Sequence, residues 1–160
     1  MFGMLVGKLV GKPEVPMVEN ELRELIKSLN EIKGDTSHVE AKACEGGFPK
    51  RLWESVSAFA NTPGGGIIIL GVKETSEGLR VVGLKDPKKF QSDMASLCSQ
   101  MVPQVRALIE IHKIDGHFLL TAEIPESSYK EKPCYYQGSG AISGSFIRVA
   151  DGDRQLTQYE

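Results

Sequence analysis

The chain of 160 residues is 41% hydrophobic and 25% charged, with a formal net charge of −2 and a pI near 6.0. These values are ordinary for one soluble domain with its own core, and they argue against a protein that holds nucleic acid by overall positive charge, so any basic surface must be local. The three widely spaced cysteines argue against a zinc site and a disulfide framework, which favours a cytoplasmic location. The apolar first ten residues are too short to cross a bilayer, and no membrane partner is expected.

The first half of the chain predicts two helices and two strands. Residues 17–30 predict an amphipathic helix, because apolar side chains recur there at helical spacing (Leu22, Leu25, Ile26 and Leu29). HVEAKAC, residues 38–44, alternates and predicts a short strand with one charged face. Residues 49–61 predict a second helix, and GIIILGV, residues 66–72, predicts a strand buried on both faces.

The second half predicts hairpins around one more helix. LRVVGL, residues 79–84, follows the turn TSEG as a hairpin partner, and Asp86 predicts an N-cap before a helix that ends ahead of Pro103. Residues 107–124 predict a hairpin around an Asp-Gly turn. CYYQ and SFIRVA predict two short strands. The order predicts an α+β fold: a mixed, largely antiparallel sheet with two main helices packed on it and an N-terminal helix.

Three consecutive glycines, Gly64 to Gly66, lie between a predicted helix and a predicted strand. A phosphate-binding loop has the reverse order, with the glycines between a strand and a helix, and it supplies a lysine and a hydroxyl group that this run lacks. The dinucleotide fingerprint fails for the same reason. The glycines therefore predict left-handed backbone and a close approach of helix and strand, not a nucleotide site.

The stretches HVEAK, LWESVSAFANTPGGGIIILGV, VVGL, IPES, KPCYYQ and FIRVADGDRQ resemble, in order and spacing, the Schlafen AlbA-like domain. The resemblance covers about residues 34–155, and its most specific part is Ser-Ala-Phe-Ala-Asn-Thr followed by glycines and ILGV. It implies an AlbA-like fold and a DNA-binding domain of a transcriptional regulator. We therefore expect an N-terminal arm and helix over residues 1–33 and the domain over residues 34–160, as a fragment of a longer chain.

Basic residues gather at two predicted helix starts, where they oppose the helix dipole and suit phosphate contacts, although a solvated face is the plainer interpretation of any one of them. Alternation puts Arg148 opposite Ile147 and Val149, either in contact with phosphate together with Arg154 or in a salt bridge to Glu40 or a loop acid. The predicted nucleic-acid-binding residues are Lys42, Lys50, Arg51, Lys85, Lys88, Lys89, Arg148 and Arg154.

Acidic residues support an alternative that rests on the resemblance. In vertebrate Schlafen proteins, acidic residues of this region form an RNA-cleaving site, and Asp35, Glu40 and Glu74 match it by position, although Ala41 replaces the usual aromatic residue between Glu40 and Lys42. Three carboxylates could hold Mg²⁺ or Mn²⁺ for a nuclease. The plainer interpretation is a solvated Glu40–Lys42 pair on one strand face.

The prediction is therefore a DNA-binding module that is not an enzyme and needs no cofactor or metal. The alternatives are a metal-dependent endoribonuclease and a sensor or oligomerisation domain. DNA is the expected partner, with RNA and a second copy of the chain as further candidates.

Overall fold

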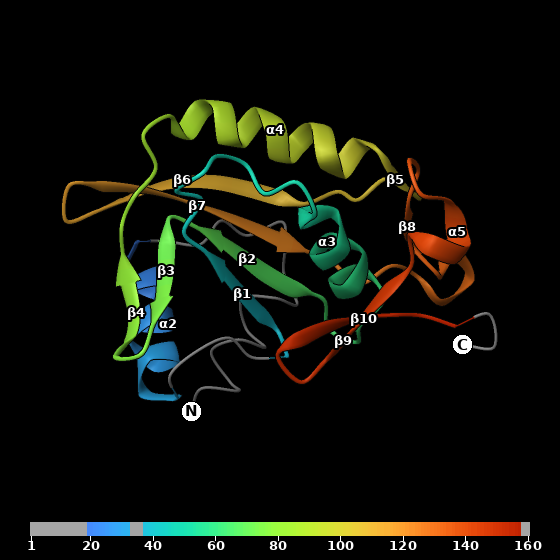
Figure 1. Ribbon diagram of the computed structural model, residues 1–160, viewed down its shortest axis with the longest axis horizontal. Helices are drawn as coiled ribbons and strands as arrows, with labels where there is room; N and C mark the ends of the chain where they lie inside the picture. The colour runs from blue at the N-terminus through green and yellow to red at the C-terminus, as the bar shows by residue number, and fades with distance from the viewer. Residues whose placement is uncertain (1–18, 33–36, 158–160) are drawn as a thin grey trace.

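A mixed four-stranded sheet organises the part of the chain that the structure describes, residues 19–32 and 37–157 of a computed structural model (Figure 1). Strand β1 (Val39–Lys42) runs parallel to β2 (Gly66–Leu70). Strands β7 (His117–Ile124) and β6 (Leu108–Ile114) follow as antiparallel neighbours. The predicted α+β fold with a mixed, largely antiparallel sheet is confirmed.

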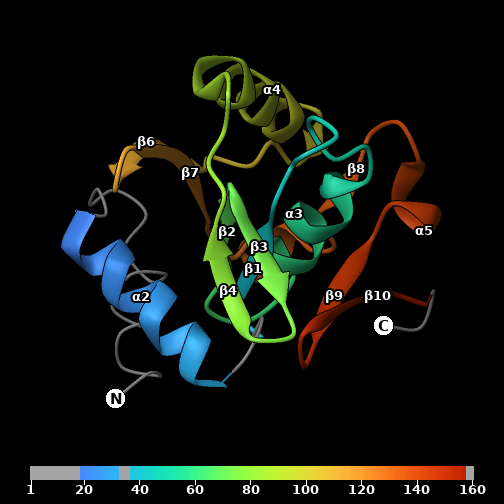
Figure 2. The same ribbon diagram turned by 60° about the vertical axis from the view of Figure 1, so that its left-hand side comes forward.

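Helices cover both faces of this sheet (Figure 2). Helix α2 (Glu19–Ile32) lies on one face, and helices α3 (Leu52–Ala60) and α4 (Pro87–Ser99) lie on the other. Helix α2 confirms the predicted N-terminal helix, whereas the arm expected before it falls outside the described residues. In the described part of the chain, no helix combines the length and the apolar character needed to cross a bilayer.

Strand β2 separates two apolar cores. Ile67 and Ile69 pack with the leucines of α2, while Ile68 and Leu70 pack under α3 and α4. All four side chains are fully buried. Because successive side chains of a strand point to opposite faces, only a continuous apolar run can serve both layers, and the predicted two-sided burial is confirmed.

The remaining elements are short. Gly71, at a φ of 103°, ends β2, so the stretch predicted as one strand to residue 72 divides into β2 and a separate hairpin. The C-terminal hairpin, residues 146–155, has a second strand that the sequence pattern did not predict. These elements are β3 (Val72–Thr75), β4 (Gly78–Val81), β5 (Met101–Val102), the 3-10 turn η1 (Tyr129–Glu131), β8 (Tyr135–Tyr136), α5 (Gly140–Ser143), β9 (Phe146–Val149) and β10 (Gly152–Gln155).

The glycine run joins α3 to β2 where the two elements nearly touch. Gly64 and Gly65 have φ values of 84° and 69°. A Cβ on Gly65 would lie 2.1 Å from the carbonyl oxygen of Ile124, and one on Gly66 would lie 2.1 Å from the Phe59 ring. Left-handed backbone and close packing therefore account for these glycines, as the sequence predicted.

We predict that Gly65→Ala destabilises the fold by at least about 2 kcal/mol, because the new methyl group meets backbone and the residue must keep a left-handed φ. Urea unfolding measures the loss. Gly46→Ala is the matched control, since a Cβ there meets nothing within 4 Å. Equal free energies of unfolding for the two variants would contradict this account of the glycine run.

A second prediction concerns His112 on β6, whose Nε2 lies 2.9 Å from Thr121 Oγ1. Burial lowers the pKa of His112, so the unfolded chain binds its proton more readily than the folded chain does. Above the unfolded pKa, near 6.5, His112 therefore does not reduce the free energy of unfolding. As the pH falls below that value, the unfolded chain takes up the proton first, and the free energy of unfolding falls by at most about 1.4 kcal/mol per pH unit. Between pH 7.5 and 5.5, His112→Gln should lose less unfolding free energy than the wild type. An unchanged slope would show that His112 does not carry the effect.

Candidate nucleic-acid interface

Arg148 on β9 is buried, with 1% of its side chain exposed, and it holds two carboxylates. Its guanidinium pairs with Glu40 on β1 and, at 3.0 Å, with Asp153 Oδ1 on β10. It also donates to the Val39 carbonyl oxygen at 3.1 Å and lies over the Phe59 ring, 5.1 Å from its centroid. Burial lowers the pKa of Arg148, but the attraction of Glu40 and Asp153 outweighs burial and raises this pKa, so the guanidinium stays charged.

Two further side chains complete this cluster. Ser55 Oγ on α3 lies 2.8 Å from Asp153 Oδ2 and 3.1 Å from Glu40 Oε2. Lys42 Nζ lies 3.1 Å from Glu40 Oε1, and 44% of the lysine side chain is exposed. We call Arg148, Glu40, Asp153, Ser55 and Lys42 the Arg148 network. It contains two positive and two negative charges, so the buried carboxylates are balanced within the fold.

Polar side chains of α3 and of the loop after it form hydrogen bonds with the backbone of β9 and of the residue before β8. The Asn61 amide donates to the carbonyl oxygens of Cys134 and Phe146 at 2.9 and 2.8 Å, and Asn61 Oδ1 accepts from Cys134 N at 2.7 Å. Ser57 Oγ accepts from Phe146 N at 2.9 Å, and Thr62 Oγ1 accepts from Arg148 N at 3.1 Å. The polar positions of the Ser-Ala-Phe-Ala-Asn-Thr motif are thus structural, as predicted for Asn61.

Of the two interpretations of Arg148, the salt bridge to Glu40 is present in the structure, and the guanidinium has almost no solvent exposure. Glu40 and Lys42 share one strand face, as predicted. Arg154 is exposed on β10 and, by alternation, points away from the Asp153 side of the hairpin.

The carboxylates of the nuclease alternative are not brought together where the structure describes them. Glu40 is engaged by Arg148 and Lys42, whereas Glu74 is exposed on β3 opposite Leu79. Asp35 falls outside the described residues. Over residues 19–32 and 37–157, no three Asp, Glu, His or Cys side chains form a group that could hold a metal ion.

The other predicted basic residues lie in two segments: directly before α3, whose start lies beside Asp93 of α4 and its C-cap Gln100, and around the start of α4. The rings of Phe48 and Phe90 pack at a centroid distance of 6.0 Å and join these two segments. Lys50 lines a small cavity with Asp93, and Asp93 accepts from Lys89 Nζ at 2.9 Å. The other basic side chains of this face are Arg51, which pairs with Glu54, and the exposed Lys85 and Lys88.

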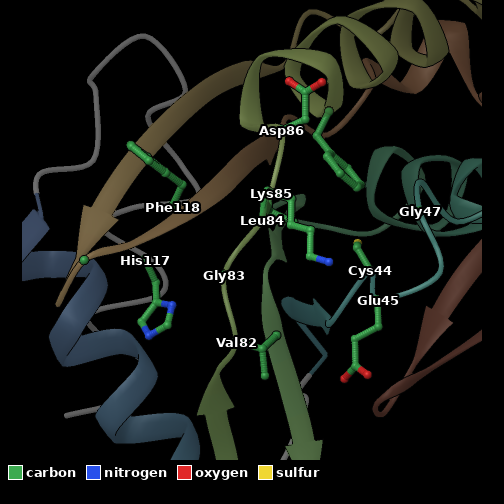
Figure 3. A pocket seen from close by; sticks show the side chains of 12 residues that line it. Cys44, Glu45, Gly47, Val82, Gly83, Leu84, Lys85, Asp86, His117 and Phe118 are labelled. Atoms are coloured by element: carbon green, nitrogen blue, oxygen red, sulfur yellow. The ribbon is translucent and has the colours of Figure 1, made fainter.

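Lys85 has a different setting from its neighbours. It lines a cavity of about 670 Å³ beside the linker between β4 and α4 (Figure 3). Asp86 follows it as the N-cap of α4 and accepts from Lys89 N at 3.2 Å, which confirms the predicted helix start.

Sequence reasoning missed Ser55 and Asp153. Asp153 is the cross-strand partner of Arg148, and the turn that makes them partners contains Ala150 at a φ of 55° followed by Asp151 and Gly152. An Asp-Gly pair between alternating residues is a hairpin signal, so the second strand and its acid could have been found. Ser55 carried no such signal, because only the packing of α3 brings it to Glu40.

Most of the chain matches one known protein family. The Schlafen, AlbA_2 family matches residues 35–157. No curated protein matches the sequence.

Two solved structures share the fold. One is the N-terminal domain, solved by NMR, of a Nitrosomonas europaea protein whose name relates it to the ATP-dependent DNA helicase RecG. It is 32% identical, with a TM-score of 0.63, over 86% of this chain and 95% of that one. The other is the crystal structure of the DIP2311 protein from Corynebacterium diphtheriae, 17% identical with a TM-score of 0.54. That match covers 84% of this chain and 30% of that one, and at this identity it shows the fold alone.

We predict that Arg148→Met costs about 3–5 kcal/mol of unfolding free energy, because it leaves Glu40 and Asp153 facing each other without their shared cation. Adding Glu40→Gln should recover part of that loss, since one uncompensated charge is then gone. Urea unfolding of the two single variants and the double variant measures this coupling. Strictly additive losses would show that the two side chains do not depend on each other.

Proposed function

We propose that this chain, which belongs to the Schlafen AlbA_2 family, is a DNA-binding module of a transcriptional regulator that contacts the phosphate backbone. Membership of this family supports the proposal, because the resemblance of the sequence to the family implies a DNA-binding domain. The relative from Nitrosomonas europaea supports it as well, since the name of that protein links it to a DNA helicase.

The observation that carries the proposal is the Phe48–Phe90 contact. It holds the loop before Lys50 and Arg51 against the first turn of α4, which contains Lys88 and Lys89, in a protein whose net charge is −2. A local cluster of this kind can hold an anionic backbone although the whole chain is slightly acidic.

The surface charges of this face are available to phosphate. Lys50 and Lys88 are exposed and have no ion-pair partner among the residues that the structure describes. Arg51 and Lys89 pair with Glu54 and Asp93, but exposed pairs are worth little and can be exchanged for contacts with a phosphate. Lys85 extends the same face toward the larger cavity.

The remaining predicted residues enter the proposal in other roles. Arg148 acts as a positioning residue: it fixes Glu40, and Glu40 in turn holds the half-exposed Lys42 at the surface. Arg154 is exposed on the other side of the β9–β10 hairpin and forms a separate contact point. No feature of the described residues favours the nuclease alternative over binding.

We predict that Lys50→Met and Lys88→Met each weaken binding of a fluorescent 20-base-pair duplex and each lower the salt slope of the affinity by about one, because each removes one phosphate contact. Fluorescence anisotropy at several salt concentrations gives both quantities. Lys27→Met, an exposed lysine of α2 on the other face of the sheet, is the matched control and should leave both unchanged.

Two results would contradict the proposal. One is an equal effect of Lys27→Met and of the two interface variants, which would indicate attraction to charge in general. The other is cleavage of labelled DNA or tRNA in the presence of Mn²⁺ that is lost in Glu40→Gln, which would establish a nuclease.

A further inference from the structure

We propose that the cavity beside the linker between β4 and α4 binds a small molecule that combines one anionic group with an apolar ring. The cavity measures about 670 Å³, which is within the range of sites for small ligands. Nothing in the proposed DNA-binding function requires a cavity of this kind.

Part of the cavity wall is apolar. Val82, Leu84, Phe90 and Phe118 line it, and Phe118 is a large hydrophobic side chain with 39% of its surface exposed. A ring placed against these side chains would cover apolar surface that otherwise meets water.

Charges of both signs line the cavity. Of its two acids, Glu45 pairs with Lys73 Nζ at 3.0 Å and Asp86 caps α4, so Lys85 is the charge that remains for a ligand. Lys85 and His117 both line the cavity, and neither has a hydrogen-bond or ion-pair partner within the described residues. The Lys85 amine and the His117 ring belong to the lining drawn in Figure 3. A phosphate or carboxylate would complement the Lys85 amine, and the His117 ring, which lies apart from it in Figure 3, offers a second polar contact to the ligand.

The cavity is already formed without a ligand, because backbone hydrogen bonds fix its linker wall. Val82 N and Gly83 N both donate to the Gly71 carbonyl oxygen at 2.9 Å, and Leu84 N donates to the Phe118 carbonyl oxygen at 2.8 Å. A rigid wall spares the ligand the entropic cost of ordering a loop.

Cys44, which also lines the cavity, would take no covalent part. Burial raises the pKa of its thiol to about 11, so at neutral pH the sulfur is neither negative nor nucleophilic. It therefore adds no repulsion against an anion, and binding should be reversible.

The test uses three probes of one shape: 1-naphthyl phosphate, 1-naphthoate and the neutral 1-naphthalenemethanol. We expect both anions to produce saturable NMR shifts at the amides of three lining glycines, with dissociation constants of about 1 mM or tighter. The glycines are Gly47, Gly83 and Gly116. The neutral probe should bind at least about tenfold more weakly. A preference between the anions would identify the head group as phosphate or carboxylate.

Substitutions of two lysines test which side chain binds the anionic group of the probes. Lys85→Met should weaken binding of the anions about tenfold and Lys85→Arg should retain it, whereas Lys88→Met, at a neighbour that does not line the cavity, should leave the dissociation constants of these probes unchanged. The NMR spectrum of each variant also reports whether it is folded. The proposal is overturned if none of the three glycines shifts at millimolar probe, or if Lys85→Met and the wild type bind the anions equally. No nucleic acid is used, so failure here leaves the proposed DNA binding standing.

Discussion

A buried arginine that cannot remain unpaired fixes the C-terminal hairpin to the rest of the fold. Transfer of a guanidinium or a carboxylate out of water costs several kcal/mol, so Arg148, Glu40 and Asp153 tolerate burial only together. These contacts consequently hold strands β1, β9 and β10 in one arrangement. Helix α3 joins them through Ser55. The position of Lys42 at the surface depends on the same arrangement, because Glu40 holds its amine.

Because of this constraint, the charged side chains of the protein serve two different roles. The carboxylates and the arginine on the β9 side are used within the fold, whereas exposed lysines remain at the starts of α3 and α4. Their position follows from the apolar contact of Phe48 with Phe90, which belongs to the core under α3 and α4. A slightly acidic protein can in this way carry a basic face, and we propose that this face meets the DNA backbone.

Local signals in the sequence predict much of the fold. The apolar run of β2 predicts two-sided burial, Asp86 before Pro87 predicts the start of α4, and the Asp-Gly pair predicts the β6–β7 hairpin, because each is a short-range preference of the backbone. Alternation likewise predicts that Glu40 and Lys42 share a face. Such signals could not place Ser55 in the Arg148 network, since Ser55 and Asp153 are 98 residues apart and meet only through tertiary packing.

The most direct test of this division of charges is a map of where DNA touches the protein. Titration of the uniformly ¹⁵N-labelled chain with a short duplex, followed by amide chemical shifts, reports every backbone position at once. We predict that the largest shifts fall in residues 47–51 and 85–90, with small shifts at residues 146–148, of which 146 and 148 are buried. Largest shifts along β9 and β10, with residues 47–51 and 85–90 unchanged, would contradict the account and place the interface on the opposite side of α3.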